Sequence, residues 1–264
     1  MADRRARLNE ASPAGRPVPL CTLADNHDPP AMSYPESKTD RRKARSDTTR
    51  NALMRAAEKL MAERGIENVT IRDIVTEAQQ KNSSALQYHF SNRQGLIEAI
   101  HAERARETQD MREAMLEELM RQNPQPELRQ LCRMMVEPAF ALARSHVGFR
   151  RYIKAFGHEL ALSETSAFSK VGRQGAGGVS GERLGALLSG VLPDLTEASY
   201  RRRLEAAVRL CSASMYHQAR QRSAFQGKVA ILFLNSLIDA LVGLLSATES
   251  EETRAAARAF EGGE

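Results

Sequence analysis

The sequence predicts an all-α protein with a small N-terminal helical domain and a larger C-terminal helical domain. Leu occurs 27 times, whereas Val and Ile together occur 19 times, which favours helix over strand. Apolar residues recur at steps of three and four, and no segment shows the strict alternation of a half-buried strand. The 264 residues are 27% charged and 42% hydrophobic, as in an ordinary soluble protein with a sizeable core.

Residues 1–44 are expected to form a disordered extension with a basic end. Six of the ten prolines lie in residues 1–40, and this stretch has almost no periodic apolar pattern. It therefore buries too little apolar surface to offset the entropy lost on ordering. The basic residues at its start precede no apolar run, which excludes a secretory signal. Because nothing upstream of Met32 looks structural, translation is expected to start at Met1 or Met32.

Residues 45–101 are expected to form the first domain, with three short helices and the start of a long fourth one. Gly65 directly follows the first apolar pattern and is expected to end the first helix as its C-cap. Thr70 directly precedes the second pattern and is expected to be the N-cap of the second helix. Ser91 or Asn92 can cap a long helix that runs to about Gln122. The first helix has one apolar face, made of Ala52, Leu53, Ala56, Ala57, Leu60 and Met61.

The excess positive charge is concentrated in this part of the chain. The formal charge of the whole sequence is +5, and residues 41–101, with eleven basic and seven acidic side chains, carry +4 of it. The pI near 9.3 agrees with a polyanionic partner, although a solvated surface explains such a cluster equally well.

Three short helices in about forty-five residues, two of them joined by a polar turn, are typical of a helix-turn-helix. Only the major groove of DNA admits a helix and presents a distinct donor and acceptor pattern for each base pair. The helix that enters it must be polar on one face and apolar on the other. Residues 82–89 fit, because Ala85 and Leu86 can face the core while Asn82, Ser83, Ser84 and Gln87 face the groove.

Residues 49–100 resemble the TetR family of one-component transcriptional regulators. The order and spacing of the matching residues make the resemblance specific, although it covers only about a fifth of the chain. The matching positions are Ala56-Ala57, Leu60-Met61, Gly65, Thr70, Ile74, Val75, His89-Phe90, Arg93 and Leu96. The chain departs from the family pattern at two places. The turn at 78–82 is one residue longer than usual and lacks the usual glycine, and Gln87 replaces the usual tyrosine.

The resemblance implies a DNA-contacting role for specific side chains. Thr70 and Arg72 are expected over the phosphate backbone. Lys81, Asn82, Ser83, Ser84 and Gln87 are expected in the major groove, with Gln87 the best candidate for bidentate reading of adenine. Tyr88, His89 and Arg93 are expected on phosphates, which position the helix without reading sequence. Arg45, with Arg41, Arg42 and Lys43, can form an arm over the backbone or the minor groove. For each, the alternative is an exposed residue that contacts nothing.

Residues 102–247 are expected to form a helical regulatory and dimerisation domain, followed by a polar tail, 248–264. Helices are expected near 126–144, 149–162, 181–191, 196–224 and 227–247. The last has an apolar stripe, Ile231, Leu234, Ile238, Leu241, Val242 and Leu245. Asn235 and Asp239 near its centre argue against a membrane span. We expect the stripe to pack against the same helix of a second copy in a homodimer, since two recognition helices read a palindromic operator.

The resemblance also implies a small-molecule effector bound in the C-terminal domain. Candidate lining residues are Met134, Met135, Phe140, Phe149, Tyr152 and Phe156, although aromatics at helical spacing are more often core. The predicted function is that of a cytoplasmic dimeric repressor released by such an effector. One alternative is a DNA-binding regulator with no pocket, controlled by a protein partner or by abundance; a less favoured one is an all-α enzyme on the same scaffold.

No catalytic, cofactor or metal site is expected. His158-Glu159 begins an HExxH-like stretch, but residue 162 is Leu, so the second zinc ligand is missing. The glycine-rich stretch 172–181 has neither the GK[ST] ending nor the preceding strand of a phosphate-binding loop, and we expect a connector there. The three cysteines form no metal or disulfide pattern, and Cys132 and Cys211 lie in apolar patterns that predict buried, inert thiols.

Overall fold

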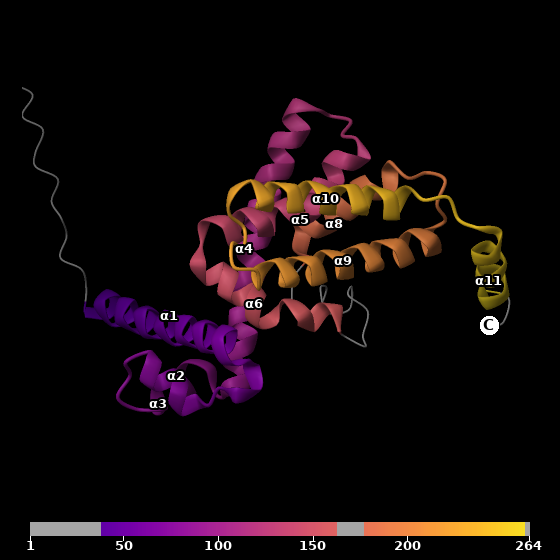
Figure 1. Cartoon of the computed structure of the whole chain (residues 1–264). Helices are drawn as coiled ribbons and strands as arrows, with labels where there is room; N and C mark the ends of the chain where they lie inside the picture. The colour runs from indigo at the N-terminus through magenta and orange to yellow at the C-terminus, as the bar shows by residue number, and fades with distance from the viewer. Residues whose placement is uncertain (1–37, 163–176, 262–264) are drawn as a thin grey trace, which may run out of the picture. The chain divides into compact units, whose positions relative to one another are not determined.

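The computed structural model describes residues 38–162 and 177–261, and throughout these ranges the regular structure is helical (Figure 1). The prediction of an all-α fold, with a helix-turn-helix domain followed by a helical domain, is confirmed. The expected extension up to residue 37, residues 172–176 of the expected connector and the last three residues of the tail lie outside the described residues.

The first helix, α1 (Lys38–Arg64), begins earlier than the sequence analysis predicted. Residues 38–44 were expected to be the basic end of a disordered extension, and they are helical instead. The reason is local, because this segment is rich in Lys and Arg, which favour helix, and no Pro or Gly follows Pro35 until Gly65. Gly65, with φ of 86°, ends the helix as expected.

The remaining helices lie close to their predicted positions. Two differences concern the C-terminal end, where α9 ends at Ala219 instead of continuing to residue 224, and where part of the expected polar tail forms α11. Its Ala-rich sequence and ion pairs from Arg254 and Arg258 to Glu251 explain this last helix. The bounds are η1 (Ile66–Asn68), α2 (Ile71–Glu77), α3 (Ser84–Phe90), α4 (Arg93–Gln122), α5 (Leu128–Ser145), α6 (Val147–Ala161), α8 (Gly178–Gly190), α9 (Glu197–Ala219), α10 (Gly227–Ser246) and α11 (Glu251–Glu261).

Two hydrophobic cores organise the described chain, and α6 contributes to both. The first core joins α1, α2, α3 and the start of α4, and it includes Ala155 and Phe156 of α6. The second core joins the rest of α4 to α5, α6, α8, α9 and α10, and it includes Phe149 and Ile153 of α6. Tyr152 packs against both cores. The small domain is therefore held to the larger one by the side chains of α6 as well as by the long helix α4.

Most of the apolar stripe of α10, which was expected to pack against a second copy, packs inside the chain's own second core. Leu234, Ile238, Leu241 and Leu245 are buried there, because α10 lies against α5 and α9 (Figure 1). Val242 is half-buried and packs on the same core, while Ile231 is exposed. Periodicity identified the apolar face of α10 correctly, but it did not identify the partner.

The two polar side chains in the middle of α10 are paired with arginines of α5. Asp239 forms an ion pair with Arg129, and Arg133 Nη2 donates to Asn235 Oδ1 over 3.4 Å. With a mean hydropathy of 2.1, α10 is long and apolar enough to cross a membrane. One such helix is weak evidence for a span, since core helices of soluble proteins pass the same test.

Candidate nucleic-acid interface

The helix-turn-helix begins at Thr70, which caps α2 as predicted. Thr70 Oγ1 accepts a hydrogen bond from the Asp73 backbone N–H over 3.2 Å, and the Thr70 backbone N–H donates to Asp73 Oδ2 over 2.9 Å. The Thr70 hydroxyl also donates to Asp73 Oδ2 over 2.6 Å, and these bonds lower the pKa of Asp73. The Thr70 hydroxyl was predicted to contact a DNA phosphate, but its proton is donated to Asp73 in this structure. The Arg72 side chain, predicted for the same role, is exposed.

The turn after α2 is a Schellman motif built without glycine. The Gln80 N–H donates to Val75 O over 2.9 Å, and the Gln79 N–H donates to Thr76 O over 3.0 Å. Gln79 has φ of 56°, in the left-handed region that glycine adopts most easily. This residue occupies the position of the family's usual glycine, so the chain makes the same kind of helix end with a residue that is strained there.

Helix α3 presents one polar face to solvent and one apolar face to the core. Leu86 and Phe90 are buried, Gln87 is exposed and Tyr88 is 76% exposed. Asn82 Oδ1 accepts from the Ser84 backbone N–H over 3.0 Å, so the amide NH₂ of Asn82 remains as a donor. The predicted groove residues are all exposed: Lys81, Asn82 and Ser83 in the turn before α3, and Ser84 and Gln87 on α3. The structure thus brings together the side chains that the sequence proposed for base contacts.

The position of α3 depends on a tight connection to α4. Ser91 has φ of 63° and ψ of −47°, and the Asn92 N–H donates to Phe90 O over 2.7 Å, which makes a γ-turn. Asn92 caps α4 by accepting from the Gly95 N–H over 2.9 Å. A Cβ on Gly95 would lie 2.1 Å from Phe90 O, so only glycine fits there. Gly95 was not among the residues predicted from the sequence, although a glycine in the first turn of a long helix was a signal.

The structure gives Arg93 a different role from the one predicted. Its Nε donates to Val69 O over 3.2 Å, and its Nη2 donates to Ile66 O. The guanidinium therefore ties the start of α4 to the loop between α1 and α2. We now assign Arg93 to holding this loop, in place of the expected phosphate contact.

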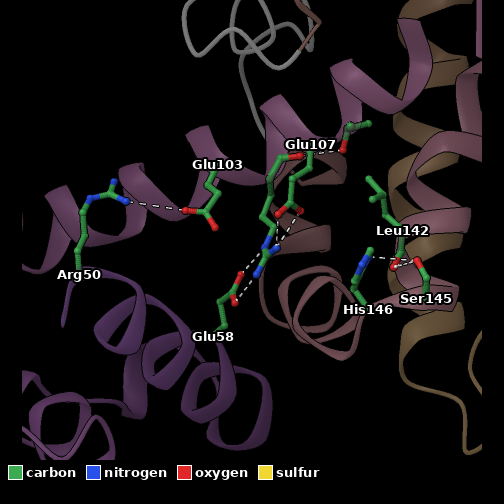
Figure 2. A network of polar contacts seen from close by, with 9 residues as sticks. Arg50, Glu58, Glu103, Glu107, Leu142, Ser145 and His146 are labelled. Atoms are coloured by element: carbon green, nitrogen blue, oxygen red, sulfur yellow. Dashed lines mark hydrogen bonds and ion pairs between the residues drawn. The ribbon is translucent and has the colours of Figure 1, made fainter. Parts of the chain in front are cut away.

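Two further side chains lie near the end of α3, His89 on α3 itself and Arg50 on α1. His89 is half-buried, and burial, with a smaller contribution from Arg50, lowers its pKa, while Asp47 opposes the shift. Arg50 of α1 lies over the Phe90 ring, 5.3 Å from its centre, and pairs with Glu103 of α4 at 3.8 Å (Figure 2). No pattern along the sequence singles out Arg50. On the N-terminal part of α1, Arg45 is exposed beside Arg42 and Lys43.

The sequence of the helix-turn-helix matches a known protein family. The family described as bacterial regulatory proteins, tetR family, matches residues 53–100. Residues 53–100 form a TetR-family domain. No curated protein matches the chain. Two similar solved structures are RolR in complex with resorcinol (16% identity, TM-score 0.43, 79% of this chain and 98% of that chain) and GusR of Salmonella enterica (19% identity, TM-score 0.39, 75% and 95%).

A buried ion pair connects the TetR-family domain to the helices that follow it. Arg104 of α4 donates from Nε and Nη2 to the two carboxylate oxygens of Glu58 of α1, over 2.6 and 2.7 Å. Its Nη1 donates to both oxygens of Glu107, and Figure 2 shows Glu58 and Glu107 reaching the same guanidinium. Burial by itself lowers the pKa of Arg104, but the bonds and charges of these carboxylates outweigh it and raise the pKa.

Helix α6 packs on the same guanidinium. Arg104 lies over the ring of Phe149, 5.9 Å from its centre, and a Cβ on Gly148 would come within 3.0 Å of Arg104 Nη2. A second contact, 3.2 Å long, joins the Tyr152 hydroxyl to His101 Nδ1 of α4. A shift of α6 therefore acts directly on the side chain that holds the TetR-family domain.

The six residues predicted to line an effector pocket are packed in the cores of the described chain. Met134, Phe140, Phe149 and Phe156 are buried, and the ring of Phe140 packs on Phe225 and Phe233. Met135 and Tyr152 are half-buried against the same cores. The two surface hollows described below border none of the six. These residues are therefore core side chains in this structure.

Cys132 and Cys211 are unpaired and lie among apolar side chains. Burial raises the pKa of Cys132 to about 11 and that of Cys211 to about 12. Both thiols are therefore protonated at neutral pH, in agreement with the prediction that they are inert.

Proposed function

We propose that this chain is a sequence-specific DNA-binding repressor that acts as a homodimer in the cytoplasm. The observation that carries the proposal is the polar face of α3, which displays Gln87 and Tyr88 while Leu86 and Phe90 hold the helix on the core. Gln87 has the geometry of a side chain that can bond adenine in the major groove through two hydrogen bonds. Lys81 and Tyr88 supply donors for the flanking phosphates.

The dimer contact that we propose uses the outward face of α10 in place of its buried stripe. Val229 and Leu232, three residues apart, are exposed on this face, with Leu232 67% exposed, and Ile231 is exposed about 100° further round the helix. Exposed large apolar side chains on one helix face are typical of an interface. A symmetric contact through this face pairs α10 with α10 of a second copy, so two α3 helices can read the two halves of a palindrome.

The repressor is proposed to release DNA when α6 moves. Because α6 lies in both cores and packs on Arg104, an effector that shifts it also shifts the pairing of α1 with α4. The effector must bind the two positions of α6 unequally, since equal binding shifts no population. The packing of the six predicted pocket residues favours a second candidate, a regulator without an internal pocket at that place, controlled by a protein partner or by abundance.

Selection of bound fragments from genomic DNA tests the proposal and supplies the operator. Affinity for the recovered site is then compared with affinity for a scrambled site by fluorescence anisotropy. We expect Gln87→Ala to reduce the ratio of the two affinities about tenfold or more, as for the loss of one bidentate base contact. Gln94→Ala, a matched substitution in the exposed first turn of α4, leaves the ratio unchanged. Equal loss on both DNA sequences in Gln87→Ala contradicts the assignment of base reading.

A further inference from the structure

Four basic side chains meet in a surface hollow that the DNA-reading function does not use. Arg150, Arg151 and Lys154 come from α6, and Arg222 comes from the loop between α9 and α10. The hollow has a volume of about 230 Å³, and none of the described residues that line it is acidic. Its other lining residues are Val147, Ala219, Ser223, Ala224 and Gln226.

The arrangement of these cations is unfavourable without an anion. Arg150 and Lys154 are four residues apart on one face of α6, and Arg151 and Lys154 are three apart, so the like charges repel one another. Arg150 Nη1 donates to Ala143 O over 2.8 Å and to Arg144 O over 3.2 Å, which fixes its guanidinium but supplies no negative side chain. An anion in the hollow relieves the repulsion among all four groups.

We propose that this hollow binds the diphosphate or a similar multiply charged phosphate group of a small molecule. Two or more negative charges match four converging cations, and guanidinium groups suit phosphate oxygens because their N–H donors form a fork. The volume is below the range of about 300–1,000 Å³ typical of pockets that enclose a whole ligand. The hollow therefore holds the phosphate part, and the remainder of the molecule lies outside it.

Arg151 connects this hollow to the TetR-family domain. It also lines a neighbouring hollow with Arg55 and Lys59 of α1, with Glu77 of α2 and with Gln79 of the turn after α2. The charge of Arg151 contributes to lowering the pKa of Glu77, after the hydrogen bond and charge of Lys59. Arg151 therefore borders both hollows, and a phosphate group bound beside it lies close to the hollow that α2 lines.

The test is isothermal titration calorimetry of the full-length protein with inorganic pyrophosphate. We expect saturable binding of one pyrophosphate per chain, with Kd below about 1 mM. The double variant Lys154→Gln/Arg222→Gln changes two exposed side chains and should weaken pyrophosphate binding about tenfold or more. Arg106→Gln/Arg201→Gln removes the same charge from exposed positions outside the hollow and leaves Kd unchanged. Absence of saturable heat, or equal weakening in both variants, overturns the proposal.

The same variants separate a phosphate site from an extension of the DNA-binding surface. Affinity for random-sequence DNA is measured at several salt concentrations. If the hollow binds a small molecule, the two double variants have the same salt dependence. If Lys154→Gln/Arg222→Gln flattens the slope by about two units more than the control, these cations contact DNA and the proposal is wrong. This test requires no operator, so it stands apart from the proposal of sequence-specific repression.

Discussion

Replacing Gly95 with Ala perturbs a close contact between the end of α3 and the first turn of α4. In an ordinary helix this change is favourable by about 1 kcal/mol, because Ala has the higher helix propensity. Here the new Cβ would lie 2.1 Å from Phe90 O, a backbone atom that already accepts the Asn92 N–H. A backbone group cannot rotate away as a side chain does, so the end of α3 must move by about 1 Å or more to restore van der Waals contact.

We expect Gly95→Ala to lower the free energy of unfolding by about 1–3 kcal/mol, the usual cost of overpacking. It should also weaken operator binding, because α3 is displaced from its groove geometry. Urea denaturation and fluorescence anisotropy measure the two effects. The control is Gly185→Ala in α8, whose Cβ would lie 3.8 Å from the Tyr200 hydroxyl, and it should be neutral or stabilising. If Gly95→Ala is as stable as this control, the contact with Phe90 is not what positions α3.

Four further substitutions and one double variant test the roles of other residues. Gln79→Gly should raise the free energy of unfolding by about 0.5–1 kcal/mol in urea denaturation, since it relieves a positive φ, and a loss of stability contradicts the left-handed turn. Arg93→Ala should lower the free energy of unfolding by about 1–2 kcal/mol without changing the salt dependence of DNA binding, because the donors of Arg93 are bound to Ile66 and Val69. If the variant's affinity depends less steeply on salt concentration, Arg93 contacts a phosphate and this assignment is wrong. A DNA phosphate beside His89 raises its pKa relative to the lowered value in the free protein, so operator affinity should rise as pH falls between these two pKa values. His89→Gln removes this slope, and a slope that persists in the variant excludes His89 as its cause. Glu58→Gln should cost about 3 kcal/mol, because Arg104 loses a buried partner, and Glu58→Gln/Arg104→Met should recover much of it; additive losses argue against coupling.

The sequence predicted the features that depend on neighbours along the chain. Thr70 was identified as a helix cap, Ser91 or Asn92 as the next cap (it is Asn92), and Gly65 as a helix end, because capping is decided within three or four residues. The exposure of Gln87 and the burial of Leu86 followed from helical period alone. For the same reason, most helix bounds agree to within a few residues.

The features that the sequence could not predict depend on contacts between distant residues. Arg93 reaches carbonyls 24 and 27 residues away, and no local pattern shows that the loop places them there. The stripe of α10 and the aromatics of α5 and α6 were recognised as apolar, but period does not distinguish a core from an interface or a pocket. The helical segments 38–44 and 251–261 were missed because both were interpreted as polar ends of the chain, although both are rich in helix-forming residues.

The early start of α1 changes how its basic residues can act on DNA. A flexible arm can bend to find a groove, but it loses conformational entropy when it is held there. Arg42, Lys43 and Arg45 are instead carried on a continuous helix of 27 residues, about 40 Å long, whose later turns are packed in the first core. Their direction is set by the rotation of this helix, so one residue inserted before Leu53 turns all three by about 100° around its axis. The length of α1 thus determines which side of the protein presents this charge.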